Sequence, residues 1–319
     1  MNKATFLVWK KYQRRAEVLT PLLNAEVLFL PHLFRRKVFR PVDYFLKALY
    51  SVYHLIVKQP KITYVQSPPL YCCIPAFFMR KPYIIDAHNS VFQNLGSKFS
   101  WGDLPLSKLF VNGSKALIVH NHRVLELAQS KYPDQKIFNI PDPLCFIKSH
   151  KNKRIKNQVF VISSFDPDEP TEILIESISK LPDYNFIITA DPIKLPVHLQ
   201  QKLRSMQNIK LTGFLEKKDY HSMICKSNAV LVLTNYDLIQ PSGACEALSS
   251  DTQLIIRKTP LIAELFGEWA ILVDNSSQSI VEAIINLKMK ELDLTLFRDK
   301  WNKQVEMELE RLIKFTQTI

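Results

Sequence analysis

The side chains best suited to chemistry follow short apolar runs of the sequence. In the first half of the chain, the run from Tyr83 leads into Asp86 and His88, and a later run leads into His120 and Asn121. Carboxylate and imidazole groups can titrate, and both can hydrogen-bond a ligand. In open α/β sheets, ligands bind at the carboxyl ends of the strands, where loops and helix N-termini converge. We therefore expect these side chains to border a binding site.

The segment "DLIQPSGACEALSS" in the second half predicts an anion site. Pro241, Ser242 and Gly243 directly precede the helical pattern "ACEAL", so a helix start there would offer free N–H groups and the positive end of its dipole to a phosphate. Glu246, about one turn into this helix, suits a bidentate contact with vicinal ribose hydroxyls. The alternative is that Ser242 is an ordinary N-cap and Glu246 only favours the dipole.

Apolar runs separated by helical lengths recur along the whole chain. The first half contains "TFLVW", "AEVLFLPH", "ITYVQSP", "YIIDAHN" and "KALIVHN"; the second contains "QVFVISSF", "YNFIITA", "NIKLTGF", "NAVLVLTN", "TQLIIRK" and "AILVDN". Strands that are apolar throughout indicate parallel sheets covered on both faces. The sequence therefore predicts an α/β protein with two doubly wound, Rossmann-like domains.

Proline residues and a basic run indicate where these domains meet. Pro141 and Pro143 break regular structure, and "KSHKNKRIKNQ" follows them. We expect a first domain over residues 1–143, a linker over 144–157 and a second domain over 158–287. Residues 288–319, a charged stretch with neither glycine nor proline, are expected to form a helical tail.

Composition excludes several classes of protein. The 319 residues include only 6 glycines, and neither GxGxxG nor GxxxxGK[ST] occurs, which argues against a typical nicotinamide dehydrogenase and a P-loop NTPase. The 5 cysteines form no CxxC pair, so they predict neither a zinc framework nor disulfides and suit a reducing cytosol. The net charge of +12 predicts an acidic partner, namely a nucleic acid, an anionic membrane surface or a phosphorylated substrate.

Three segments together resemble a known family of enzymes. "YIIDAHN" in the first half, with "TGFLEKKDYHSMICKSNAVLVLTN" and "QPSGACEALSS" in the second, is similar to the GT-B glycosyltransferases, in particular the retaining glycosyltransferase family 4. The likeness is strongest over residues 208–274. The opening "FLVWKKYQRRAEVL" is similar to short bacterial members of cell-surface polysaccharide synthesis. The resemblance implies two Rossmann-like domains facing a cleft.

The resemblance also implies roles for individual residues. Glu246 would bind the ribose of a nucleotide-sugar donor, and the amides of Gly243 and Ala244 would bind its diphosphate. Gly213 begins the segment that would face the nucleobase, and His88 would approach the donor sugar. No cofactor and no protein nucleophile would be required, because the leaving phosphate can guide the acceptor's proton while the protein positions the reactants and stabilises charge.

The sequence departs from the family at two places. A second glutamate usually stands eight residues before the ribose-binding one, but that position is Leu238, with Asp237 as a neighbouring substitute. The Arg and Lys expected after the first strand of the second domain are replaced by "SSFDPDEP", whose carboxylates would repel a diphosphate. We expect Arg257 or Lys258 to supply the missing positive charge.

The acidic segment also allows a different interpretation. Asp166 and Asp168 form a DxD-like pair of the kind that holds Mg²⁺ or Mn²⁺ in another glycosyltransferase class. Common residues form such a short pattern by chance, and an acidic helix start explains it equally well. We therefore predict no metal site.

The densest basic stretch is interleaved with aromatic residues. Residues 34–50 contain Arg35, Arg36, Lys37, Arg40 and Lys47, interleaved with Phe34, Phe39, Phe45, Leu46, Leu49 and Tyr50. This mixture suits an anionic lipid surface, although a helix packed on the first sheet with solvated charges would also show it. No nucleic-acid-binding motif accompanies the segment, so we predict no nucleic-acid partner. No apolar run is long enough to span a bilayer, and no secretory signal is present.

The sequence as a whole predicts an enzyme of sugar transfer. The expected activity is transfer from a nucleotide-sugar to a lipid-linked or saccharide acceptor, with His120 and Asn121 on the acceptor side. The expected location is cytoplasmic, on the inner face of the membrane. The alternatives are a sugar-nucleotide epimerase on the same fold and a degenerate, non-catalytic binding or scaffold subunit.

Overall fold

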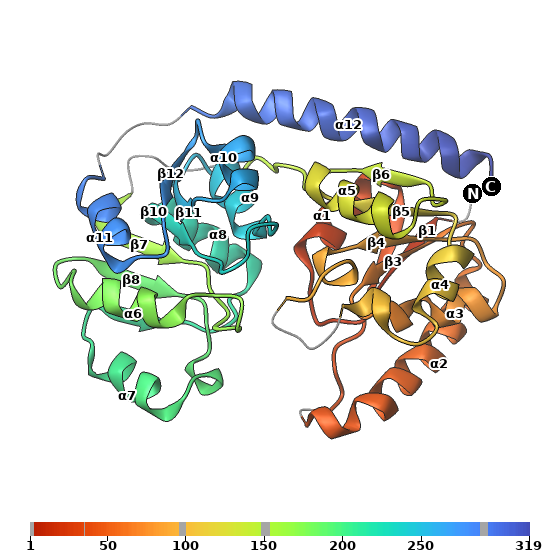
Figure 1. The fold of residues 1–319 in the computed structure, drawn as a ribbon, viewed down its shortest axis with the longest axis horizontal. Helices are drawn as coiled ribbons and strands as arrows, with labels where there is room; N and C mark the ends of the chain where they lie inside the picture. Colours follow the sequence, from red (N-terminus) through yellow and green to blue (C-terminus); the bar gives the residue numbers. More distant parts are fainter. Residues whose placement is uncertain (1–2, 35, 96–99, 148–153, 288–292) are drawn as a thin grey trace. The chain divides into compact units, whose positions relative to one another are not determined.

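The computed structural model describes residues 3–34, 36–95, 100–147, 154–287 and 293–319. The chain divides into two compact units (Figure 1). Unit 1 comprises residues 1–143 together with 301–319, and unit 2 comprises residues 144–300. The predicted linker lies in unit 2, where regular structure resumes at Ile155; its residues 148–153, and residues 288–292 of the predicted tail, lie outside the described residues.

Unit 1 contains a six-stranded parallel sheet in the order β2-β1-β3-β4-β5-β6. Its strands are β1 (Ala4–Val8), β2 (Ala25–Phe29), β3 (Thr63–Ser67), β4 (Tyr83–Ala87), β5 (Ala116–Val119) and β6 (Ile137–Asn139). The sequence predicted the first five. It missed β6, which has only three residues and lies among polar neighbours.

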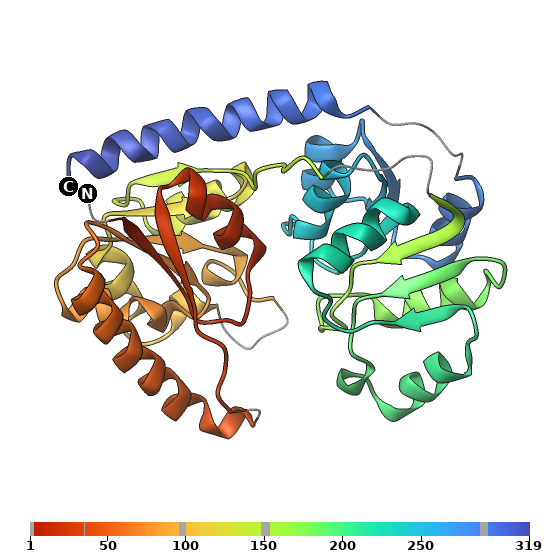
Figure 2. The same cartoon turned by 180° about the vertical axis from the view of Figure 1, so that it is seen from behind.

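The helices of unit 1 connect and cover these strands (Figure 2). They are α1 (Arg14–Leu22), α2 (Arg40–Lys58), α3 (Ile74–Phe78), α4 (Ser107–Gly113), α5 (His122–Lys131) and the part of α12 (Thr295–Gln317) that begins at Trp301. Short 3₁₀ turns lie at Lys37–Phe39, Leu70–Cys73, Asn89–Val91 and Trp101–Asp103. None of the helices in the described part of the chain is both long and apolar enough to cross a membrane.

Unit 2 repeats the architecture with the strand order β12-β11-β10-β7-β8-β9, again parallel throughout. Its strands are β7 (Ile155–Val161), β8 (Asn185–Ile188), β9 (Ile209–Leu211), β10 (Ser227–Val232), β11 (Gln253–Arg257) and β12 (Ala270–Val273). Its helices are α6 (Thr171–Ser179), α7 (Val197–Ser205), α8 (Lys217–Lys226), α9 (Ser242–Ser249), α10 (Pro260–Phe266) and α11 (Ser277–Ile285), with a 3₁₀ turn at Pro192–Lys194. The predicted α/β class with two parallel sheets is confirmed.

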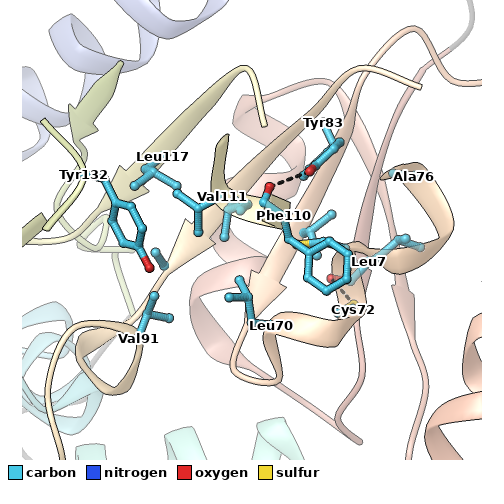
Figure 3. Packing of buried hydrophobic residues seen from close by; sticks show 14 of the residues in the cluster. Leu7, Leu70, Cys72, Ala76, Tyr83, Val91, Phe110, Val111, Leu117 and Tyr132 are labelled. Carbon is cyan, nitrogen blue, oxygen red and sulfur yellow. Dashed lines mark hydrogen bonds between the residues drawn. The ribbon is translucent and has the colours of Figure 1, made fainter. Parts of the chain in front are cut away.

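One row of side chains across each sheet forms the centre of a core. In unit 1, Leu7, Val65, Ile85 and Leu117 occupy neighbouring register positions and are fully buried. Figure 3 shows the surrounding cluster, in which the Tyr83 hydroxyl donates a hydrogen bond to the Phe110 carbonyl. Because side chains alternate across a strand, the positions between these residues point to the other face of the sheet.

The C-terminal helix contributes to the core of unit 1. Val305, Leu309 and Leu312 recur on one face of α12 and are buried, while the Trp301 indole N–H donates to the Asp142 carbonyl at 2.9 Å. Phe315 lies 5.5 Å from Phe138 between ring centroids. Residues 301–319 of the predicted helical tail therefore belong to unit 1.

Replacing Leu312 by Ala should lower the free energy of unfolding of unit 1 by about 2–5 kcal/mol, because it removes a fully buried side chain and leaves a cavity. Leu296→Ala on the same helix, where the side chain is 83% exposed, should change it by no more than about 0.5 kcal/mol. Urea unfolding followed by tryptophan fluorescence measures both. Equal effects would contradict the packing of α12 on unit 1.

Candidate functional site

His88 directly follows β4 and is held by two side chains. Its Nε2 lies 3.2 Å from Nε2 of Gln13 and 3.6 Å from Oδ2 of Asp86. The Gln13 amide has a fixed orientation, because its Oε1 accepts from the Ala16 amide at the start of α1. Its NH₂ group therefore faces the Nε2 of His88. The imidazole is about a quarter exposed and is positioned from two elements.

A buried guanidinium lies behind His88. Arg15 donates from Nε to Asp86 at 2.9 Å and from Nη1 to Asp142 at 2.5 Å, and all three side chains are buried. Burial, the largest single effect, would raise the pKa of the Asp86 carboxyl, but the charge and hydrogen bond of Arg15 together with those of His88 outweigh it and hold that pKa well below its usual range. The pKa of Asp142 is lowered in the same way against the effect of burial. Both carboxylates stay ionised inside unit 1.

His120 and Asn121, the predicted acceptor-side residues, follow β5. The rings of His120 and His88 lie 5.7 Å apart between centroids, so the structure brings these two histidines together. Burial lowers the pKa of His120 to about 3, and the neighbouring His88 and Arg15 act in the same direction. His120 is therefore neutral at physiological pH. Asn121 caps α5, since its Oδ1 accepts from the Val124 amide at 2.9 Å.

Unit 2 contains a cavity of about 290 Å³ at the carboxyl ends of β7 and β10. Hydroxyl groups, carboxylates and the start of α9 form its polar wall, and aliphatic side chains form the rest. The lining residues are Ile162, Ser163, Ser164, Asp168, Glu169, Val232, Leu233, Thr234, Ile239, Pro241, Ser242 and Gly243. Two of the predicted donor-site residues, Ser242 and Gly243, thus lie in its wall.

The first turn of α9 approaches β7 closely. A Cβ atom at Gly243 would lie 2.9 Å from Cδ1 of Ile162, so a larger residue would force a shift there. No side chain caps this helix. The Ala244 amide already donates to the Pro241 carbonyl at 3.1 Å, so a ligand would have to share or replace that bond. Exposed Ser242 and the backbone of Gly243 are the better placed of the predicted phosphate contacts.

Glu246 is buried one turn further along α9. Its Oε2 accepts a hydrogen bond of 2.6 Å from the hydroxyl of Tyr220 on α8. Glu246 is 8% exposed and is not among the described lining residues of the cavity. The carboxylate is therefore held in a fixed position by a partner from another helix.

A glutamate occupies the loop after β7. The carboxylate of Glu169 accepts hydrogen bonds from the backbone amides of Ser164 and Phe165 and from the hydroxyls of Ser163 and Ser164. Phe165 has a φ of +53°, a left-handed conformation that turns its amide toward this carboxylate. Burial raises the pKa of Glu169 despite these bonds, and burial also raises the pKa of Asp168. The carboxylate of Glu169 therefore already accepts the hydrogen bonds that this loop could offer to an anionic ligand.

The remaining predicted donor-site residues lie at the carboxyl ends of other strands of the unit 2 sheet, on the same side of the sheet as the cavity. Arg257 at the end of β11 forms a partly exposed ion pair of 3.0 Å with Asp237, and it donates to the Thr234 carbonyl at 3.3 Å. The Lys258 side chain is exposed. Gly213 follows β9 with a φ of +61°. β9 lies three strands from β10 in the sheet, a separation of about 14 Å at usual strand spacing, so only an extended ligand would reach both.

The first aspartate of the DxD-like pair already has partners within unit 2. Asp166 accepts from Ser164 Oγ at 2.7 Å and pairs with Lys194 at 2.9 Å. Among the described residues, no group of three or more His, Cys, Asp or Glu side chains is placed to hold a metal ion.

Sequence reasoning missed the residues that position the site. Arg15, Gln13 and Asp142 were not singled out, although "WKKYQRR" stands where many relatives of the suggested family carry a glycine-rich loop. Tyr220, the partner of Glu246, was not distinguished from other residues of its helix. The one available signal was an aspartate at the end of an otherwise apolar strand, which requires a buried cation nearby.

Comparisons with known proteins identify the class of fold. No family model matches the sequence, and no curated protein matches it. Solved structures match over both units, so the predicted GT-B class of fold is confirmed.

Three of these structures illustrate the likeness. Anabaena HepE, solved with UDP and glucose, has a TM-score of 0.66 at 13% identity and covers 100% of both chains. A putative UDP-N-acetylglucosamine 2-epimerase from Listeria monocytogenes has a TM-score of 0.63 at 12% identity and covers 98% of this chain and 95% of its own. The pneumococcal O-GlcNAc transferase GtfA, solved with UDP and GlcNAc, has a TM-score of 0.59 at 14% identity over 81% of this chain and 56% of its own. At these identities the likeness is one of fold.

Replacing Arg15 by Met should lower the free energy of unfolding by about 3–5 kcal/mol at neutral pH, because two ionised carboxylates lose their buried partner. Arg123→Met, the same change in the exposed pair with Glu126, should cost no more than about 1 kcal/mol.

The depressed pKa values of Asp86 and Asp142 stabilise the protein above about pH 4, and this contribution is lost on further acidification. The difference between wild type and Arg15→Met should therefore narrow in acid. Denaturant unfolding at several pH values measures it, and a constant difference would refute the assigned network.

Proposed function

We propose that this protein is a glycosyltransferase that moves a sugar from a nucleotide-sugar donor to a lipid-linked or saccharide acceptor. The observation that carries the proposal is the cavity of unit 2, which joins the start of α9 to the carboxyl ends of β7 and β10. Sharing a fold with a protein that holds UDP and glucose, and with an O-GlcNAc transferase, supports the choice of donor.

The donor contacts proposed for unit 2 combine the wall of the cavity with residues whose roles the family resemblance implies. The Ser242 hydroxyl and the amide of Gly243, at the positive end of the α9 dipole, bind the diphosphate. Glu246 binds the ribose hydroxyls, and Tyr220 holds its carboxylate in place. Gly213 marks the end of the donor site that faces the base. Arg257 and Lys258 supply positive charge, and Asp237 fixes the Arg257 guanidinium.

In unit 1, we propose that His88 contacts the donor sugar. Gln13 and Asp86 hold its ring through Nε2. Neutral His120 beside it, with Asn121, serves the acceptor. Transfer is proposed to proceed with retention, as in glycosyltransferase family 4, with the leaving phosphate accepting the acceptor's proton. The chain's own contribution is then positioning and charge stabilisation.

The proposed setting is cell-surface polysaccharide or glycolipid synthesis on the inner face of the membrane. A membrane-bound acceptor explains the basic and aromatic residues of segment 34–50, which the sequence analysis assigned to an anionic lipid surface. No nucleic-acid partner is proposed.

A sugar-nucleotide epimerase is the second candidate, favoured by the shared fold with the putative Listeria monocytogenes epimerase. An epimerase converts the nucleotide-sugar without any acceptor, so free epimerised donor would identify it. A degenerate binding subunit, suggested by Leu238 and the acidic loop, would turn over no donor at all.

The proposed donor site predicts a ligand-dependent shift of thermal unfolding. Purified protein should be stabilised by one class among UDP-, GDP-, ADP- and TDP-sugars, by about 2.7 kcal/mol at 100 times the dissociation constant. Glu246→Ala should abolish this shift and Tyr220→Phe should reduce it, because the ribose contact is lost or loosened. Glu172→Gln, which removes an exposed carboxylate on α6, should retain it. No shift with any donor, with or without Mg²⁺, would refute the nucleotide-sugar proposal.

The acidic loop predicts a second change in donor affinity. Glu169→Gln should bind the donor on the order of tenfold more tightly, a gain of about 1.4 kcal/mol, because a negative charge in the cavity wall is removed. The pKa of Glu169 is raised by burial, so acidification neutralises the wild-type carboxyl at a higher pH than an ordinary glutamate, and the affinity of the wild type should then approach that of the variant. Titration calorimetry at several pH values measures this. Weaker binding by Glu169→Gln at every pH would mean that Glu169 contacts the donor directly.

A further inference from the structure

The α2 helix turns its apolar side away from unit 1. It has ten exposed residues, and Lys58 is the only charged one. Eight large apolar or aromatic side chains recur at intervals of three and four residues and are between 38% and 63% exposed. They are Val42, Phe45, Leu46, Leu49, Tyr50, Tyr53, Ile56 and Val57. We call this set the α2 outer face; it covers roughly 140° of the helix.

Polar side chains fix the helix in this orientation from the inside. Asp43, Lys47 and Ser51 are buried at intervals of four residues on the opposite side. Asp43 accepts from the Leu33 amide at 2.8 Å, Lys47 donates to the Trp9 carbonyl at 3.3 Å, and Ser51 accepts from the Trp9 indole at 3.1 Å.

The exposed apolar side of α2, opposite a buried polar side, points to a nonaqueous partner. A surface helix normally exposes its polar side. The α2 helix buries Leu55 in the core of unit 1, but the side that it exposes is almost entirely apolar. Rotation of α2 to bury the outer face would break each of the polar contacts on its inner side. The α2 outer face is therefore a permanent surface of unit 1, larger than the scattered apolar residues of an ordinary surface.

The charges around α2 select the partner. Residues 32–61 contain seven Lys and Arg residues and a single carboxylate, Asp43, which is fully buried. Asp43 pairs with Lys47, and Glu26 on β2 pairs with Lys58 at 3.3 Å, so positive charge is still in excess around the helix. A second copy docked on this face would bring the same positive charges together. An anionic lipid surface instead complements them, and tyrosine and phenylalanine side chains favour the boundary between lipid and water.

We propose that the α2 outer face lies in the surface of an anionic bilayer, with the helix parallel to the membrane plane. The proposal rests on the membrane setting of the proposed function and assigns it a surface. It corrects the sequence prediction in two respects. Lys47, predicted to face lipid, is 3% exposed and bonded inside unit 1, and the lipid-facing residues continue past position 50 to Val57. Arg35 lies outside the described residues.

Vesicle co-sedimentation of the full chain tests the proposal. Wild type should bind vesicles of phosphatidylcholine with phosphatidylglycerol, bind phosphatidylcholine alone at least tenfold more weakly, and lose binding as salt rises. Combined Phe45→Gln, Leu49→Gln and Tyr53→Gln should reduce binding at least tenfold. The matched control combines Ile193→Gln, Val197→Gln and Leu296→Gln, three even more exposed apolar positions outside unit 1, and should bind like wild type.

The nucleotide-dependent thermal shift and light scattering distinguish failure of the membrane proposal from failure of the proposed function. The triple α2 variant should keep the nucleotide-dependent thermal shift, which shows that it is folded and that donor binding is independent of the membrane. A wild type that shows this shift but does not bind anionic vesicles would overturn the membrane surface and leave the proposed donor site intact. A concentration-dependent dimer by light scattering, lost in the triple variant, would overturn it in favour of a second copy on this face.

Discussion

The polar end of unit 1 depends on one buried guanidinium. Arg15 neutralises Asp86 at the end of β4 and Asp142 just before the chain enters unit 2, and the backbone carbonyl of Asp142 also accepts from Trp301 on α12. A buried carboxylate without such a partner would be protonated or would unfold its surroundings. The interaction therefore ties three distant parts of the sequence to one place. It also fixes Asp86, one of the two groups that hold His88.

In unit 2, the group that occupies the loop at the strand ends is a carboxylate rather than a guanidinium. Its loop after β7 offers amide and hydroxyl donors of the kind that bind an anion, but Glu169 of the same loop already fills them. A donor diphosphate bound at the start of α9 would meet this negative charge in the same cavity. The positive dipole end of α9, with Arg257 and Lys258 on the neighbouring strand, must then supply the attraction. Such a balance makes affinity for an anionic ligand sensitive to single charges in this wall.

Local sequence patterns were sufficient to predict the strands but not the contacts between them. Of the strands in the described part of the chain, all but β6 lie in the apolar runs that the sequence analysis singled out. The three residues of β6 stand between polar residues and prolines and form no such run. The start of α9 was predictable from Pro241, Ser242 and Gly243, since helix starts have local signals. The pairing of Arg15 with Asp142, 127 positions apart, has no such signal. The sequence analysis placed Lys47 at a lipid surface because it lies among basic and aromatic residues. Contacts with Trp9, which is distant in the sequence, bury it inside unit 1 instead.

The most direct test of the account is amide hydrogen exchange of the whole protein with and without the nucleotide-sugar that stabilises it. The account predicts that the donor slows exchange in the peptide covering residues 239–249, at the start of α9, and in residues 162–169 across the cavity. It predicts no comparable protection in α6, which lies outside the proposed contacts. Protection confined to other segments, with the start of α9 unchanged, would contradict the central claim that this cavity binds the donor.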